Sequence, residues 1–160
     1  MTDIYISQKG DSRILAPRML MMYNGQNETL RYDENGRPYF ASAFVSISHS
    51  GSLWACALSD APCGVDIQKK QDVRFDKLAS RYFTESEAAR VSKEGRDAFF
   101  EIWTAKEAYA KLTGEGLAKT HRTSPFDEGL CITYFDAGEG FTGCAVSGSH
   151  NGSIRVFTVD

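Results

Sequence analysis

The sequence lacks the features that mark membrane proteins, secreted proteins and proteins built on metal clusters. No apolar run approaches the roughly 20 residues that a helix needs to cross a bilayer. The N-terminus, Met1-Thr2-Asp3-Ile4, has no basic segment leading an apolar signal core. The four cysteines are scattered without a Cys-x-x-Cys pair, so neither a zinc site nor a disulfide framework is indicated. We therefore expect a cytoplasmic protein whose cysteines are small core residues.

A surplus of positive charge is also missing. The formal net charge is -3, which argues against general affinity for nucleic acid, because such binding rests on many Lys and Arg contacts to phosphates. Any anion that the protein binds must be held by a local cluster. The chain has 160 residues, 42% of them hydrophobic and 24% charged, which suits one compact domain or two small half-domains sharing a core.

Residues 99–117 are the stretch around which the rest is read. Good helix formers fill it up to Leu112, and Gly114 and Gly116 are of the type that commonly ends a helix, so we expect a helix of about four turns. One face of this helix carries a broad apolar stripe. Its members are Phe99, Ile102, Trp103, Tyr109 and Ala110.

Charged residues interrupt the apolar stripe. Lys106 falls near its centre, and Glu107 falls at its edge with Lys111 one turn further along. In one interpretation, Lys106 snorkels to water while Glu107 and Lys111 form an i,i+4 surface pair. In the other, a carboxylate and one or two lysines project from a rigid helix into a polyanion site. The pattern alone leaves both open.

The first part of the chain predicts strands, a helix and a hairpin. We expect a strand over residues 3–7, a helix over 12–23 and a hairpin within 30–40. The alternating segment 44–50 is a strand that delivers Ser48, His49 and Ser50 to its end, and residues 53–58 return. A lone His at a strand end is usually structural, but the flanking hydroxyls suit a phosphate or ribose contact better.

The second part begins after the best candidate for an internal boundary, residues 61–63. The strand 64–68 turns Val65 and Ile67 to one face and Asp66 and Gln68 to the other. In one interpretation, both polar side chains are exposed to water. In the other, the Asp66 carboxylate binds a hard cation such as Mg²⁺.

The remainder predicts helices and then strands. Thr84 and Glu87 have capping-box spacing and open a short helix that ends before Gly95. Three strands, expected to form an antiparallel meander that closes the second half, cover residues 131–135, 141–146 and 154–159. Before these helices lies a locally basic stretch, which is either a solvated helix face or a dock for an acidic partner. It comprises Lys69, Lys70, Arg74, Lys77 and Arg81.

Four segments in one order resemble the 4′-phosphopantetheinyl transferase superfamily. They are Gly36-Arg37-Pro38, Ile-Ser-His-Ser-Gly at 47–51, Gly-Val-Asp-Ile-Gln at 64–68, and residues 103–111 (Trp-Thr-Ala-Lys-Glu-Ala-Tyr-Ala-Lys) followed by Gly-Glu-Gly-Leu at 114–117. Within that superfamily the set is most similar to the Sfp type, which serves nonribosomal peptide, polyketide and related carrier proteins. The likeness covers roughly residues 37–117, about half of the chain.

This resemblance implies a pseudo-twofold α+β fold. Two small half-domains would each have an antiparallel sheet and packed helices, with coenzyme A bound in the cleft between them. Residues 1–62 would be a shortened N-terminal half on the nucleotide side, and residues 63–160 the half with the metal and the catalytic helix. The implied reaction moves the 4′-phosphopantetheine arm of coenzyme A to a serine of an apo acyl or peptidyl carrier protein and releases 3′,5′-ADP.

The resemblance also implies residue roles. Asp66 and Glu107 would be ligands of Mg²⁺, with Mn²⁺ as the alternative ion. Glu107 would take the proton of the carrier serine, and Lys111 would meet charge on the leaving phosphate. Contacts to coenzyme A are expected from Ser48, His49, Arg37, Lys106, Lys111 and, through a looser match, Arg13.

The chain departs from the family pattern at two places. Gln68 stands where many Sfp-type members carry a third acidic ligand, so its amide oxygen or water would complete the metal site and Mg²⁺ would bind more weakly. The segment before Ser12 is shorter than in typical members, which predicts a more open cleft or one completed by a second subunit. The carrier would dock near Arg74, Lys77 and Arg81.

Two other functions remain open at this point. The chain could be a catalytically weak relative that binds coenzyme A or a carrier protein without transfer. It could also be an Mg²⁺-dependent hydrolase that cleaves a pyrophosphate with the same carboxylates.

Overall fold

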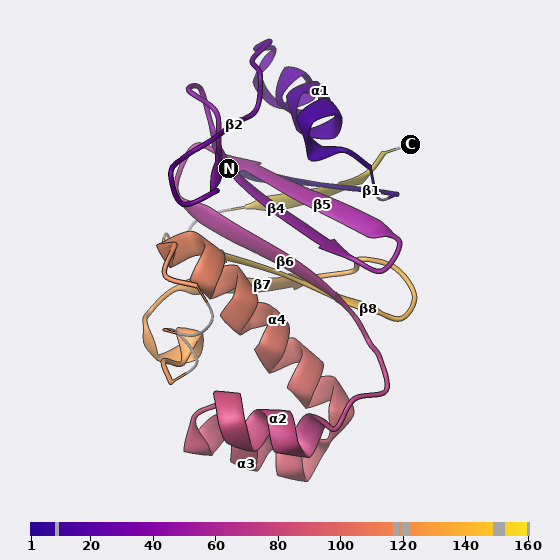
Figure 1. Cartoon of the computed structure of the whole chain (residues 1–160), viewed down its shortest axis with the longest axis vertical. Helices are drawn as coiled ribbons and strands as arrows, with labels where there is room; N and C mark the ends of the chain where they lie inside the picture. Colours follow the sequence, from indigo (N-terminus) through magenta and orange to yellow (C-terminus); the bar gives the residue numbers. More distant parts are fainter. Residues whose placement is uncertain (9, 117–118, 120–121, 149–152, 160) are drawn as a thin grey trace.

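The computed structural model describes residues 1–8, 10–116, 119, 122–148 and 153–159. Two sheets lie at the centre of this α+β molecule, with helices on their outer sides (Figure 1). The first sheet has the order β4 (Phe44–Ser50), β5 (Leu53–Ser59), β1 (Thr2–Gln8) and β9 (Ile154–Thr158). The second has the order β6 (Cys63–Lys69), β8 (Phe141–Ser147) and β7 (Cys131–Phe135).

The helices cover the outer faces of the two sheets. The helix α1 (Ser12–Asn24) packs on the first sheet, and α4 (Arg96–Thr113) lies along the second. Beyond α4 lie α2 (Phe75–Tyr82) and α3 (Glu85–Glu94), as Figure 1 shows. The remaining elements are a small ribbon of β2 (Arg31–Tyr32) and β3 (Pro38–Tyr39), and the short helix η1 (Pro125–Asp127). None of the described helices combines the length and apolar character needed to cross a membrane.

The core between the sheets follows from strand alternation. Val65 and Ile67 of β6 are fully buried in a cluster with residues of the first sheet. Because side chains alternate along a strand, Asp66 must face the other way, toward α4. The first-sheet members of this cluster are Ile4, Ile6, Ala55 and Ala57.

Serine hydroxyls join the edges of the two sheets. The edge strand β6 has its backbone N–H groups at Val65, Ile67 and Lys69 turned away from β8. These groups donate to the hydroxyl oxygens of Ser46 (3.0 Å), Ser48 (3.3 Å) and Ser50 (2.9 Å) of β4. We call these three residues the serine ladder. It pairs backbone donors that would otherwise be buried without a partner, and so fixes the register of β6 against β4.

Most predicted elements are confirmed. The α+β fold, the hairpin and the first helix are found as expected, and Thr84 and Glu87 form a capping box. The predicted central helix is longer than expected, because it begins at Arg96 and has 18 residues. The division of the chain near residue 62 stays a prediction.

The predicted antiparallel meander at the end of the chain is wrong for its third strand. Strand β9 leaves the second half and pairs in parallel with β1 in the first sheet. Arg155 of β9 donates to both carboxylate oxygens of Asp3 at 2.8 and 2.7 Å, and Asp3 is buried. This pair adds two charge-assisted hydrogen bonds to the pairing of β1 with β9, and the first sheet is mixed rather than antiparallel.

Helix α4 approaches β6 closely because Gly64 has no side chain. A Cβ at this position would overlap the carbonyl oxygen of Ala108 and lie 2.8 Å from the backbone nitrogen of Leu112. On α4, small residues face the sheet, with Ala105 and Ala108 fully buried. The helix therefore lies near enough for side chains one turn apart to reach the polar face of β6.

We expect Gly64→Ala to destabilise the protein by about 1–3 kcal/mol or more, because overpacking would push α4 away from β6. The measurement is urea unfolding. Gly148→Ala is the matched control, since a Cβ there meets nothing within 4 Å, and it should stay within about 0.5 kcal/mol of the parent. Equal stability of the two variants would contradict the close-packing interpretation.

Candidate functional site

Asp66 is the centre of a polar cluster on the face of β6 that is turned toward α4. Its side chain is only 3% exposed. One carboxylate oxygen, Oδ1, accepts from Ser48 Oγ at 2.7 Å and from Lys111 Nζ at 2.8 Å, and Oδ2 accepts from Gln68 Nε2 at 2.8 Å. Strand alternation explains why Asp66 and Gln68 share a face, as the sequence predicts.

Helix α4 brings Glu107 and Lys111 to this cluster. Lys111 Nζ also donates to the Val65 carbonyl oxygen at 3.0 Å, and 30% of its side chain is exposed. Burial raises the pKa of Glu107, the negative charge of Asp66 raises it further, and Lys111 partly opposes both effects. Two carboxylates thus lie close enough to repel one another. Such a pair is a natural place for a cation.

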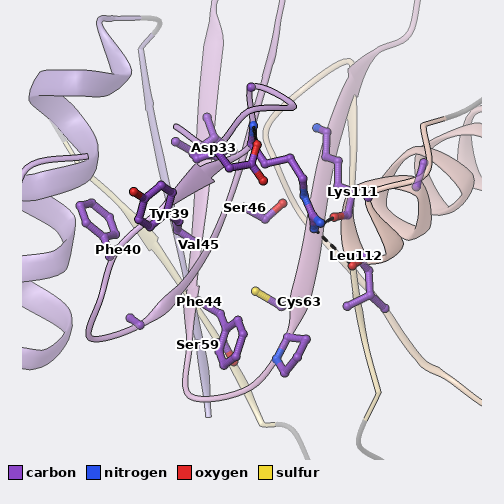
Figure 2. Close-up of a pocket in the computed structure, with 18 of the residues that line it drawn as sticks. Asp33, Tyr39, Phe40, Phe44, Val45, Ser46, Ser59, Cys63, Lys111 and Leu112 are labelled. Atoms are coloured by element: carbon purple, nitrogen blue, oxygen red, sulfur yellow. Dashed lines mark hydrogen bonds between the residues drawn. The ribbon is translucent and has the colours of Figure 1, made fainter. Parts of the chain in front are cut away.

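A cavity of about 850 Å³ opens beside the cluster. Figure 2 shows Lys111 and Leu112 of α4 on one side of it and Tyr39 and Phe40, which follow the hairpin turn, on the other. Glu107 also lines it. The cavity therefore lies between the hairpin and β4 on one side and the C-terminal end of α4 on the other.

Comparison with known protein families identifies the family of this chain. A family model described as the 4′-phosphopantetheinyl transferase superfamily matches residues 62–155. The chain belongs to this superfamily.

Individual relatives agree with the family assignment. The protein named 4′-phosphopantetheinyl transferase gsp, from Aneurinibacillus migulanus, is 31% identical over 122 residues, which are 72% of this chain and 51% of that protein. The protein named 4′-phosphopantetheinyl transferase Sfp, from Bacillus subtilis (strain 168), is 33% identical over 94 residues, 56% of this chain and 42% of that protein. The chain thus spans about half the length of the curated relatives it matches.

In this member of the superfamily, Arg37 connects the hairpin to α4. Its Nη2 donates to the carbonyl oxygens of Lys111 at 3.0 Å and Leu112 at 3.5 Å (dashed lines in Figure 2), which are free groups at a helix C-terminus. Gly114 has φ 75°, and a Cβ there would overlap the guanidinium. Arg37 lines the cavity and also holds the helix end in place, while the contact to coenzyme A that the resemblance implies stays a prediction.

Lys106 is not brought to the Asp66 cluster. It is 1% exposed, so the interpretation that it snorkels to water is wrong. Its Nζ donates to Glu87 Oε2 and to the Thr123 carbonyl oxygen, both at 2.8 Å. The sequence pattern predicts only a capping role for Glu87. Its position on the helix just before α4 is the signal that could have identified it as the partner of Lys106.

The other residues for which the sequence predicts a role lie on other elements of the molecule. Arg13 is on α1, paired with Asp11 at 2.8 Å, and does not line the cavity. His49 is exposed on the face of β4 opposite Ser48. The proposed docking residues Arg74, Lys77 and Arg81 are exposed on and beside α2. Leu117, which ends the fourth motif, lies outside the described residues.

The donor set of the cluster fits Mg²⁺. Within the described residues, no three His, Cys, Asp or Glu side chains gather to hold a metal, so the protein offers the two carboxylates of Asp66 and Glu107. The Gln68 side chain lies beside Asp66, and rotation of its amide would present an oxygen in place of nitrogen. Mg²⁺ commonly takes one or two carboxylates, keeps several waters and completes its shell with substrate phosphates.

We expect Glu107→Gln to raise the midpoint of urea unfolding at neutral pH. The folded-state pKa of Glu107 lies above its ordinary value, so between these two values the native state holds more protons than the unfolded state. Stability from this group is therefore lost as pH rises through that window, and the advantage of the variant should grow from acid to neutral pH.

Glu101→Gln is the control for this measurement. Glu101 is on the same helix, 40% exposed and paired with Arg90, so its loss should cost at most about 1 kcal/mol and give no gain. An advantage of Glu107→Gln that is absent or does not change with pH would contradict the repulsion between Glu107 and Asp66.

We expect Lys106→Met to lower the free energy of unfolding by about 3–5 kcal/mol, because it leaves the Glu87 carboxylate buried without its counter-charge. Within the described residues Glu87 Oε1 already has no hydrogen-bond partner. Lys93→Met, at an exposed position of α3, is the control. The ion pair is structurally unimportant if urea unfolding shows the two variants to be equally stable.

Proposed function

We propose that this chain transfers the 4′-phosphopantetheine arm of coenzyme A to a serine of an apo acyl or peptidyl carrier protein in the cytoplasm, with Mg²⁺ and with release of 3′,5′-ADP. One observation carries the proposal. Asp66 and Glu107, from elements far apart in the sequence, meet with Lys111 beside a large cavity. The family match at residues 62–155 supports it.

The reaction makes and breaks one phosphorus–oxygen bond. The serine oxygen bonds to the phosphorus that carries the pantetheine arm, the bond from that phosphorus to the oxygen bridging the two phosphates breaks, and the serine proton passes to a base. Such a transfer asks a protein mainly to position the reactants and to neutralise negative charge. A rigid helix that presents a carboxylate and an ammonium one turn apart meets both demands.

The cluster residues divide this work. Asp66 and Glu107, with the Gln68 amide, would hold Mg²⁺ or Mn²⁺, which when bound neutralises charge on the pyrophosphate. Lys111 lines the cavity and is partly exposed, so its ammonium faces the leaving phosphate. Glu107 would also accept the proton of the serine; a carboxylate beside a dication stays ionised at neutral pH, so Glu107 is a good ligand and a mild base.

Coenzyme A would occupy the cavity beside these residues. Its volume of about 850 Å³ lies in the range of about 300–1,000 Å³ that is usual for ligand sites. Arg37 lies in the cavity wall and His49 at the end of β4, on the nucleotide side. Lys106 and Arg13 take no part, because their charges are paired away from the cavity.

The carrier protein would dock on exposed basic residues. Arg74, Lys77 and Arg81 lie on and beside α2 and are exposed, and an acidic carrier would be attracted by them. Because the Sfp-type motifs are present, the assay should first use a carrier protein of nonribosomal peptide or polyketide synthesis.

The test is to incubate the chain with coenzyme A, Mg²⁺ and an apo carrier protein and to weigh the carrier by mass spectrometry. We expect a gain of one phosphopantetheine arm, loss of this gain on removal of Mg²⁺, and a fall of at least about a hundredfold in rate for Glu107→Gln, since it removes a base and a metal ligand. Glu101→Gln, on the same helix but paired with Arg90 and absent from the cavity wall, should retain transfer.

Two outcomes would contradict the proposal. Cleaved coenzyme A with an unmodified carrier would make the protein a pyrophosphate hydrolase. Bound but intact coenzyme A with an unmodified carrier would make it a binding protein.

A further inference from the structure

Residues 41–43 form the part of the cavity wall between β3 and β4, and we call them the wall segment. All three line the cavity, and Figure 2 shows Phe40 and Phe44, which flank the segment, in the same wall. Phe40 is buried in a core cluster with residues of α1, whereas Ala41 and Ser42 are exposed. Apolar packing therefore fixes the start of the wall segment but not its middle.

The carboxylate of Glu28 holds the middle of the wall segment. Its Oε2 accepts from the backbone N–H of Ala41 at 2.7 Å, and its Oε1 accepts from the backbone N–H of Ser42 at 3.0 Å. Glu28 lies in the connection between α1 and β2. Both oxygens of one carboxylate thus bind two successive backbone N–H groups, an arrangement that holds anions well.

Few other hydrogen bonds hold the wall segment. Within the described residues they come from Asn24 of α1, whose Nδ2 donates to Ser42 Oγ at 3.0 Å and to the Ser42 carbonyl oxygen at 3.5 Å. Hydrogen bonds from the Ser42 side chain and from the Ala41 backbone lower the pKa of the Glu28 carboxyl, so this group is charged at neutral pH. Loss of the Glu28 carboxylate would leave the segment tied by one side chain.

We propose that Glu28 is a positioning residue for coenzyme A binding. Its carboxylate fixes the wall segment in the shape that receives the ligand, and Glu28 itself does not line the cavity. The inference rests on the proposed function, because it assumes that coenzyme A occupies the cavity. No motif in the sequence marks Glu28, which lies before the first of the four motif segments.

The physical basis is preorganisation of the cavity wall. Without the Glu28 carboxylate, the wall segment would sample several conformations, and binding would have to order it at a cost in backbone entropy. Ordering a single residue in this way corresponds to a loss of about 5–30-fold in affinity.

The charge of Glu28 alone would act in the opposite direction. Coenzyme A is a polyanion, so removal of a nearby carboxylate should strengthen its binding through reduced repulsion. The sign of the effect therefore separates positioning from charge.

The test measures coenzyme A binding to the full chain by calorimetry with Mg²⁺ present. We expect Glu28→Gln to weaken binding by about 5–30-fold, because the amide accepts only one of the two hydrogen bonds and turns an NH₂ group toward the other donor. Glu34→Gln is the matched control, since Glu34 is exposed at the hairpin turn, does not line the cavity and loses the same charge. It should bind coenzyme A as tightly as the parent or more tightly.

Two further readouts separate positioning from general stability. In the transfer assay, the KM for coenzyme A should rise in Glu28→Gln, while kcat at saturating coenzyme A stays within about twofold of the parent value. Amide hydrogen exchange at Ala41 and Ser42 should become faster, with exchange in β5 unchanged.

An affinity of Glu28→Gln equal to that of the parent, or raised as charge removal alone predicts, would overturn the inference. It would also be overturned by a fall in kcat as large as the rise in KM, or by faster exchange in β5 as well, because the loss would then belong to the fold as a whole.

Failure of the proposed function has a different signature. If the parent chain does not bind coenzyme A, the proposed occupant of the cavity is wrong, and the inference about Glu28 is refuted with it. If the parent binds coenzyme A without transfer, the proposed function is refuted while the calorimetric test of Glu28 still decides the inference. If the parent binds and transfers, and Glu28→Gln binds equally well, only the inference about Glu28 is refuted.

Discussion

The structure depends on how the edge of β6 satisfies its backbone donors. An edge strand presents a row of N–H groups that must be paired when the edge is buried. Here serine hydroxyls of β4 pair them, so two sheets meet through side chains and remain separate. A shift of one residue would exchange Asp66 for Val65 or Ile67. The ladder therefore fixes the fold and the place of the central carboxylate together.

The second constraint is the close approach of α4 to that strand. Gly64 and the small residues of the helix remove the bulk between them, and only then do Glu107 and Lys111 reach Asp66. The arrangement has a cost, because a half-buried glutamate faces a buried aspartate. Groups placed for function are often destabilising to the fold that holds them. Lys111 reduces this cost by bonding to Asp66.

Local patterns in the sequence predict the elements well. Alternation identifies β6 and the face of Asp66, capping residues identify α3, and glycine ends α4 at Gly114. The motifs then indicate that Asp66, Glu107 and Lys111 belong together. Each of these features depends on residues that are near one another in the sequence, or on a resemblance that already includes the spacing.

Long-range pairing is what the sequence could not supply. Alternation in 154–159 predicts a strand but contains no information on its neighbour, which is β1, whose buried Asp3 pairs with Arg155 from the other end of the chain. Lys106 falls on the apolar stripe, yet its partner comes from α3. Ser48 is a polar residue at a strand end by pattern alone, and only the packing of two sheets turns its hydroxyl to Asp66.

The parallel pairing of β9 with β1 also bears on the order in which the chain can fold as it leaves the ribosome. Strands β1, β4 and β5 emerge early and can pair at once, but β1 keeps one open edge until β9, more than a hundred residues later, has been made. An open edge is a template for pairing with a neighbouring nascent chain. Closure of this edge of the first sheet therefore waits until β9 has been translated.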